Sequence, residues 1–277
     1  MSDSPVLTQL DDDGVLTVTI NRPETKNAFD TPTQRLMLDA FSDAARNPAV
    51  HVVIMTGAGK AFSSGGDVRQ LGAADPEDAI ATRWSAEPVW NDLEYRSQRL
   101  RQFMQASFLL HRMGKPTIAM VRGPAVGMGM SLALACDFRI GSDTAFFLSA
   151  FARIGLSGDF GAAYFLTKLL GPSRAMELLM LSERISADEA LRLGLLNKLV
   201  VDAELESRTH DFARQLARGP GIAYRHIKDN VHAALDMPLE QAFDIEARNM
   251  VRCRLTQDNQ EALSALAEKR DPRFRGY

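Results

Sequence analysis

Short apolar runs alternate with amphipathic stretches in the first two hundred residues of the chain. The runs at 15–20, 52–55 and 117–121 are β-rich or continuously apolar, which predicts strands. A helix start is predicted at residue 31: Thr31 would be the N-cap, Pro32 the first helical residue and Gln34 the capping-box partner. We predict that this helix runs to about residue 46. The order strand, strand, helix returns around 117–136 and again from 138, without any sequence repeat. This pattern is typical of an α/β fold.

The second half of the chain reads as mostly helical. We predict helices at 161–170 and 173–181, a capping box at Ser186–Glu189, a helix stop at Gly194 and a short strand at 196–201. From residue 203 to 269 the chain is predicted to be helical, with breaks at 219–220 and at Pro238. Residues 72–113 are first polar and then amphipathic, with a helix over about 91–112. The aromatic residues of this stretch either pack that helix or shape a pocket: Trp84, Trp90, Tyr95, Phe103 and Phe108.

The stretch from Thr117 to Asp137 is the most distinctive part of the sequence. An apolar run enters a turn rich in glycine and proline, and the turn enters a helix of small residues predicted at 130–136. Gly127 and Gly129 permit backbone conformations that a side chain would forbid. The first N–H groups of a helix lack internal partners, so the Met128 N–H is a candidate donor to an anion or a polarised carbonyl oxygen. The alternative is that this turn only packs the helix.

A second glycine-rich turn, at residues 60–67, supplies a candidate second donor. If the Ser64 N–H points at the same place as the Met128 N–H, two donors converge on one oxygen, as a thioester carbonyl that becomes an enolate requires. Two phosphate-binding patterns fail. Around residues 57–61, Ile54 stands in place of the first glycine and Ala61 in place of the hydroxyl residue. Gly127 and Gly129 are followed by Leu132 in place of a third glycine.

Composition and charge narrow the function classes. The 277 residues carry a formal net charge of −3 with scattered lysines and arginines, which argues against a nucleic-acid surface. The two cysteines and five histidines show no metal spacing, so no metal site is predicted. No secretory signal is visible, and the uncharged stretch at 117–136 is interrupted by glycine and proline. We therefore expect a cytoplasmic protein without membrane spans.

Four blocks in the right order resemble the enoyl-CoA hydratase/isomerase (crotonase) family: 21–28, 61–67, 123–137 and 186–200. The resemblance implies a spiral of ββα turns over residues 1–200, which carries the CoA-thioester site, and a C-terminal helical trimerisation region over 201–277. It further implies an acyl-CoA substrate, no cofactor other than the CoA of that substrate, and a homotrimer or a hexamer made of two trimers.

The resemblance also assigns site residues. The N–H groups of Ser64 and Met128 would form the oxyanion hole for the thioester. Residues expected at the substrate are Lys26, Asn27, Ala28, Ala61, Gly65, Gly66, Asp67, Val68, Val126, Gly127, Ser131, Phe151 and Leu156. The basic tail at 269–274 is either a further contact for the CoA phosphates or simply solvated.

Two positions depart from the family pattern. Family hydratases use two glutamates, and the matching positions here are Ser131 and Phe151, neither of which can act as a carboxylate base. Asp159 offers a substitute, because several isomerase and dehalogenase branches carry a carboxylate in this loop. Its apolar neighbours would raise its pKa. The alternative is that Asp159 only caps the helix that follows.

A single base without a paired acid favours a proton shuttle, so we predict double-bond isomerisation. The alternatives are weak or atypical hydration, a thioester hydrolase or dehalogenase with Asp159 as nucleophile, and a CoA-thioester-binding scaffold without activity.

Overall fold

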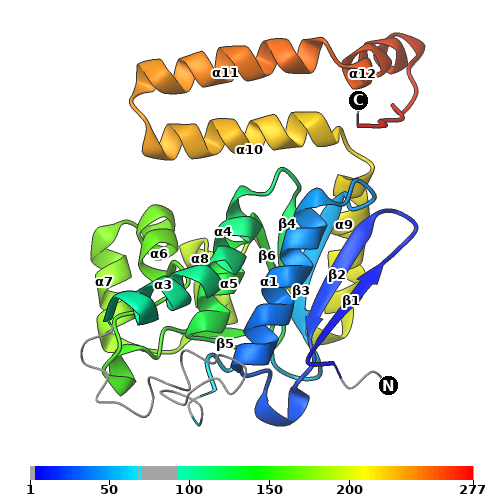
Figure 1. Cartoon of the computed structure of the whole chain (residues 1–277). Helices are drawn as coiled ribbons and strands as arrows, with labels where there is room; N and C mark the ends of the chain where they lie inside the picture. Colours follow the sequence, from blue (N-terminus) through cyan, green and yellow to red (C-terminus); the bar gives the residue numbers. More distant parts are fainter. Residues whose placement is uncertain (1–3, 68, 70–92, 277) are drawn as a thin grey trace.

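The structure is a computed structural model that describes residues 4–67, 69 and 93–276 (Figure 1). Its larger sheet has the strand order β1-β2-β3-β4-β6-β9. In this sheet β2, β3, β4, β6 and β9 run parallel, and β1 pairs with β2 in the antiparallel direction. The strands are β1 Val6–Leu10, β2 Val15–Ile20, β3 Val52–Gly57, β4 Thr117–Val121, β6 Phe138–Ser142 and β9 Lys198–Val200.

A smaller sheet lies next to it and carries the glycine-rich turn. It consists of β5 Pro124–Val126, β7 Phe146–Leu148 and β8 Ile185–Ser186. β5 follows β4 after only two residues, so the chain passes from the large sheet into the small one and then directly into helix α5, Met128–Ala135. This switch fixes the position of the first turn of α5.

Helices cover both faces of the large sheet, and the strand at its centre is buried on both sides. Val53 and Met55 of β3 belong to the core beneath α1 Thr31–Arg46, α4 Gln105–Arg112 and α5. Val52 and Ile54 point the other way and pack in the core with α9, Leu205–Ala217. This arrangement explains why the sequence of β3 is continuously apolar instead of alternating.

The remaining helices surround this core or extend from it. In Figure 1, α10 and α11 lie side by side beyond one end of the sheet, and α12 follows them. The bounds are α3 Leu93–Phe103, α6 Ala162–Leu170, α7 Pro172–Leu181, α8 Ala187–Leu193, α10 Gly221–Asp236, α11 Leu239–Arg254 and α12 Gln257–Glu268. Short 3-10 turns occupy Pro23–Thr25, Ala152–Ile154 and Asp202–Glu204. No helix in the described ranges is both long and apolar enough to cross a membrane.

Most predicted elements are confirmed, with local corrections. Asp30, and not Thr31, caps α1, because its carboxylate accepts the Thr33 N–H at 2.9 Å. Helix α5 begins at Met128, two residues earlier than predicted, and the helix expected over 91–112 is interrupted at Met104. β1 was not predicted. Trp84 and Trp90 lie outside the described residues.

Candidate active site

The turn before α5 places one N–H donor at the junction of the two sheets. Gly127, the N-cap residue of α5, has φ 51° and ψ −119°, a conformation that side chains disfavour. Its own N–H donates to the Leu148 carbonyl at 2.9 Å. The next N–H, that of Met128, has no acceptor within the described part of the chain. A free N–H at a helix N-terminus is a favourable position for a negatively charged oxygen.

The second glycine-rich segment lies directly against this turn. The Ser63 N–H donates to the Pro124 carbonyl, and the Val126 N–H donates to the Ser63 carbonyl, both at 2.9 Å. A β-carbon added to Gly129 would lie 2.7 Å from the Ser63 β-carbon, so this close approach requires glycine. The structure therefore brings together the two segments that the sequence analysis selected.

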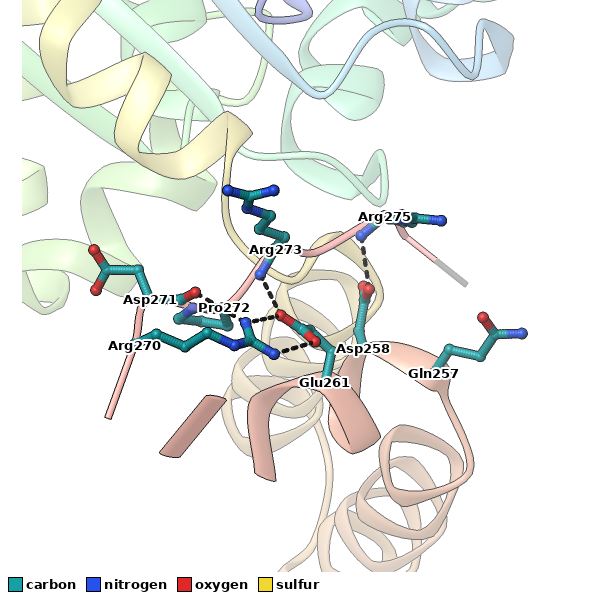
Figure 2. A pocket seen from close by; sticks show the side chains of 8 residues that line it. All are labelled: Gln257, Asp258, Glu261, Arg270, Asp271, Pro272, Arg273 and Arg275. Atoms are coloured by element: carbon teal, nitrogen blue, oxygen red, sulfur yellow. Dashed lines mark hydrogen bonds and ion pairs between the residues drawn. The ribbon is translucent and has the colours of Figure 1, made fainter. Parts of the chain in front are cut away.

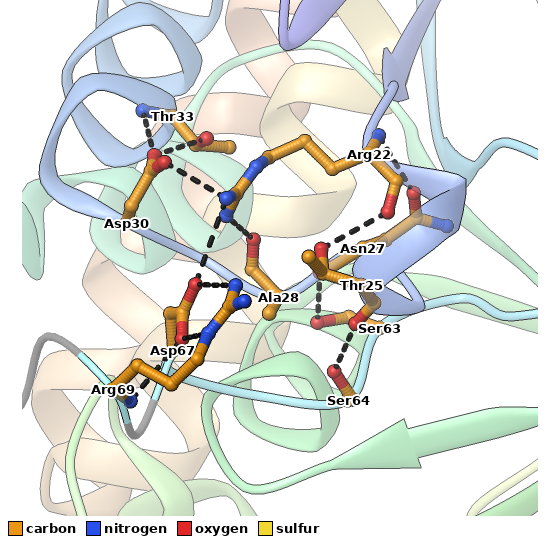
Figure 3. A network of polar contacts seen from close by, with 10 residues as sticks. All are labelled: Arg22, Thr25, Asn27, Ala28, Asp30, Thr33, Ser63, Ser64, Asp67 and Arg69. Atoms are coloured by element: carbon orange, nitrogen blue, oxygen red, sulfur yellow. Dashed lines mark hydrogen bonds and ion pairs between the residues drawn. The ribbon is translucent and has the colours of Figure 1, made fainter.

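The Ser64 N–H differs from the Met128 N–H because it already has a partner. It donates to the Lys26 carbonyl at 2.9 Å, and the Ser64 hydroxyl donates to the Thr25 carbonyl at the same distance (Figure 3). A substrate oxygen would share this N–H or take it from Lys26. Of the two predicted donors, the Met128 N–H is thus free in the described part of the chain and the Ser64 N–H is already hydrogen-bonded.

Asn27 holds the second segment in place. Its side chain is fully buried, and Nδ2 donates to the carbonyls of Ala58 and Ala61 at 2.9 and 2.7 Å. Its Oδ1 accepts the Arg22 N–H at 3.0 Å. With its amide used internally, Asn27 positions the loop, while the side chain of the neighbouring Lys26 is exposed.

Asp67 is part of an ion-pair network and is unsuited to act as a base. Arg69 binds both of its carboxylate oxygens, at 2.9 and 2.7 Å, and Arg22 bridges it to Asp30 (Figure 3). The Arg69 hydrogen bonds lower the pKa of Asp67 to about 2 against the opposing effect of burial. The carboxylate is therefore ionised at neutral pH and anchors the loop. Val68 lies outside the described residues.

Asp159 differs from Asp67 in having no ion-pair partner among the described residues and a raised pKa. Its Oδ1 is buried without a hydrogen-bond partner among the residues that the structure describes. Burial raises the pKa of this carboxyl to about 6. Its side chain does not cap α6: Gly161 is the N-cap residue, and only the Asp159 backbone carbonyl accepts a hydrogen bond, from the Ala162 N–H. A carboxylate in this condition is a candidate proton acceptor.

The ring of Phe151 connects the loop of Asp159 with the turn before α5. A β-carbon placed on Gly127 would lie 3.8 Å from Cε1 of this ring, and one placed on Gly158 would lie 3.7 Å from Cδ2. Gly127, which precedes Met128, and Gly158, which precedes Asp159, therefore both lie next to this ring. The ring is only 7% exposed.

The other predicted site residues occupy varied environments. Ser131 is fully buried and its hydroxyl donates to the Gly127 carbonyl at 3.2 Å, which supports the turn. Leu156 is 46% exposed on the loop before Asp159. Gly65 approaches the Val126 carbonyl closely, whereas Gly66 is exposed with open space around it. Ala28 and Ala61 are buried behind the loop.

The basic tail folds back on α12. The Arg270 guanidinium binds both carboxylate oxygens of Glu261, at 2.6 and 3.0 Å (Figure 2). It also binds Glu268. The Arg273 N–H adds a bond to Glu261, while its guanidinium points away from that carboxylate. Arg270 is thus already neutralised, and Arg273 is the better candidate of these two for a phosphate contact.

Comparison with known proteins identifies the family. The model of the enoyl-CoA hydratase/isomerase family matches residues 11–277. The chain belongs to this family. It is 31% identical to the trans-2-decenoyl-[acyl-carrier-protein] isomerase of Streptococcus mutans, over 96% of both chains. It is 34% identical to a Rhodobacter capsulatus protein named "Probable enoyl-CoA hydratase", over 95% of both chains.

Solved structures agree with this assignment. An enoyl-CoA hydratase from Polaromonas sp. JS666 superimposes with a TM-score of 0.86 at 30% identity, covering 98% of this chain and 99% of that one. The crotonase-like fold predicted from the sequence is confirmed, and the chain is that of an enzyme family with both isomerase and hydratase members.

Sequence reasoning missed several residues that shape the site. Arg22 was noticed only as part of a family block, although it forms ion pairs with both Asp30 and Asp67. Ser107 was not singled out, and its buried hydroxyl has no partner within the described ranges. Its position among apolar residues of a predicted helix was the signal that could have drawn attention to it.

Proposed function

We propose that this family member isomerises the double bond of an enoyl thioester, with Asp159 as the acid and base. The observation that carries the proposal is the Asp159 carboxylate, whose Oδ1 is buried without a partner among the described residues. The preceding Gly158 and the turn before Met128 both lie at the Phe151 ring. A base with a pKa near 6 is mostly ionised at neutral pH and still returns a proton readily.

In the proposed reaction, the Met128 N–H polarises the thioester carbonyl of a 3-enoyl substrate. Asp159 then takes the proton from C2, the electron pair of that bond forms a C1–C2 double bond, and the carbonyl π pair moves onto the thioester oxygen, which gives a dienolate. When the oxygen re-forms the carbonyl, the C1–C2 pair becomes the C2–C3 double bond, and the former C3–C4 pair takes the proton back from Asp159 at C4. No atom is gained or lost.

The second hydrogen bond to the oxygen would come from Ser64. Its N–H now donates to Lys26, so the developing oxyanion competes with that carbonyl for the same proton. A full negative charge is a stronger acceptor than a neutral carbonyl. This donor would therefore contribute more in the transition state than in the ground state, which favours catalysis.

Hydration is the second candidate, and the R. capsulatus relative carries a hydratase name. The side chains at the two positions where family hydratases have glutamates do not favour hydration by this chain. The Ser131 hydroxyl donates to the Gly127 carbonyl, and Phe151 supplies an apolar ring. Neither group activates water in the way that a carboxylate does.

The test compares the Asp159→Asn variant with the unmodified enzyme on a 3-enoyl-CoA and on its 2-enoyl isomer in water. The proposal expects interconversion of the two isomers to fall about 10²–10⁴-fold, the usual range for loss of a general base. A variant that keeps wild-type turnover would remove Asp159 from the mechanism. A product with a 3-hydroxyl group as the main outcome would favour hydration, and a covalent adduct on Asp159 would favour a hydrolase or dehalogenase.

We also propose that residues 201–277 form an assembly region and that the enzyme is a homotrimer or a hexamer of two trimers. Apolar side chains exposed on α11 and α12 and at the end of α11 support this: Phe243 at 61%, Met250 at 61%, Leu255 at 78% and Leu266 at 77%. Sedimentation equilibrium tests it, and a monomer at micromolar concentration would reject it.

A further inference from the structure

A cavity of about 410 Å³ begins directly beyond Asp159. Phe160 and Gly161, the two residues that follow Asp159, belong to its lining. Apolar side chains from α4 and α6, including Phe108 and Phe165, form much of the remaining wall. Phe160 has φ 49°, an unusual value for a bulky residue, and is 1% exposed. The turn that follows Asp159 thus contributes to the wall of this cavity.

Two arginines give the cavity a positive rim. Arg101 of α3 and Arg112 at the end of α4 both line it and are exposed, and neither has an ion-pair partner within the described ranges. Asp236 also lines it, but the Lys168 ammonium binds that carboxylate at 2.8 Å and the Tyr164 hydroxyl donates to it. The direct partners of Asp236 are thus Lys168 and Tyr164, and its charge acts on Arg112 only at longer range.

The cavity wall also includes a polar group that needs a partner. Ser107 lines the cavity, is 4% exposed, and its Oγ has no hydrogen-bond partner among the described residues. A buried hydroxyl without a partner is costly, so a ligand that supplies an acceptor is favoured there.

We propose that this cavity receives the far end of the acyl group and selects acyl chains that end in a carboxylate. The apolar wall suits the methylene chain, and the two arginines and Ser107 suit the terminal carboxylate. This inference rests on the proposed function, because it takes the thioester end of the substrate to lie at Met128 and Asp159.

The test uses two 3-enoyl-CoA thioesters of equal chain length, one ending in a carboxylate and one in a methyl group. The unmodified enzyme should have a higher kcat/KM for the carboxylate-terminated thioester than for the methyl-terminated one. In the Arg101→Gln/Arg112→Gln double variant, the ratio of these two kcat/KM values should fall roughly three- to tenfold, as expected for the loss of two partly exposed ion pairs. Its turnover of the methyl-terminated thioester should stay unchanged. Ser107→Ala should lower kcat/KM for the carboxylate form about tenfold.

Arg96→Gln is the matched control, since Arg96 is an exposed arginine on α3 outside the cavity lining. Equal kcat/KM for the two thioesters in the unmodified enzyme, or an unchanged preference in the double variant, would overturn the inference.

A binding measurement separates this inference from the proposed function. Calorimetry with the saturated carboxylate- and methyl-terminated thioesters, using Asp159→Asn, requires no turnover. The inference is supported if the carboxylate-terminated thioester binds more tightly and this difference is lost when Arg101→Gln/Arg112→Gln is added. This holds even if isomerisation is absent. Equal binding overturns it even if isomerisation is present.

Discussion

The Ser64 N–H donates to the Lys26 carbonyl at 2.9 Å, whereas the Met128 N–H of the adjoining turn has no acceptor in the described part of the chain. One of the two expected donors is thus held by the protein itself. Lys26 and the next residue, Asn27, both have positive φ, at 54° and 59°, so the turn that presents this carbonyl is conformationally unusual. The Ser64 N–H becomes available to substrate only in competition with this turn.

Removal of the Ser64 N–H tests whether it takes part in catalysis. Ser64→Pro eliminates the donor, and we expect kcat to fall about 10²–10³-fold, as for loss of one oxyanion donor. Ser64→Ala is the control, since it keeps the N–H and removes only the hydroxyl bond to the Thr25 carbonyl. Thermal unfolding of both variants checks that the loop remains folded. Equal kcat in the two variants would show that Met128 acts without Ser64.

The carboxyl of Asp159 should lower the stability of the enzyme at neutral pH. Burial raises its pKa from 3.8 to about 6, so the folded protein holds this proton more tightly than the unfolded chain. The free energy of unfolding therefore falls as the pH rises from about 4 to 6, and the loss persists above that range. Asp159→Asn should be about 1–3 kcal/mol more stable at pH 7.5, and this advantage should vanish near pH 4.

Urea denaturation at the two pH values measures this effect. Asp188→Asn is a suitable control, because Asp188 is exposed in the first turn of α8, where its charge is favourable. That variant should be slightly less stable at pH 7.5. A destabilised Asp159→Asn variant at pH 7.5 would mean that the carboxylate has a stabilising partner.

The same pKa predicts how activity depends on pH. Asp159 must be ionised to accept the C2 proton, so kcat/KM for isomerisation should rise with pH and level off above about 6. Asp67, with a pKa of about 2, stays ionised across this range and adds no step. Initial rates between pH 4.5 and 8 provide the profile. A flat profile would assign proton transfer to another group.

Much of this fold was predictable because local and tertiary preferences agree. β3 is apolar on both faces, and the Ser186 cap and Gly194 stop of α8 lie where the sequence indicated. The Ser64–Lys26 bond was not predictable, because it joins backbone groups of distant segments whose side chains carry no sign of it. The unpaired state of Asp159 was equally hidden, since a sequence shows the carboxyl and not its surroundings.

The contact between the two glycine-rich segments should tolerate no added side chain. In Gly129→Ala the new β-carbon would lie 2.7 Å from the Ser63 β-carbon, and both residues are buried. We expect a loss of about 1–3 kcal/mol in stability from overpacking, together with reduced kcat as Ser64 shifts relative to Met128. Gly66→Ala is the control, because nothing lies within 4 Å of its added β-carbon. Equal melting temperatures and rates for both variants would contradict the close contact.

The ring of Phe151 should control whether the transferred proton exchanges with water. It lies against Gly127 on one side and Gly158 on the other, and is 7% exposed. If it excludes water, Asp159 returns to C4 much of the proton that it took from C2, and isomerisation in D₂O gives little deuterated product. Phe151→Ala leaves a void large enough for water, at a stability cost of about 3–5 kcal/mol. Deuterium at C4, measured by mass spectrometry in single-turnover reactions, should rise clearly in this variant, whereas Phe151→Leu should stay close to the unmodified enzyme. Full deuteration in the unmodified enzyme would show that water already reaches Asp159 and that Phe151 does not shield it.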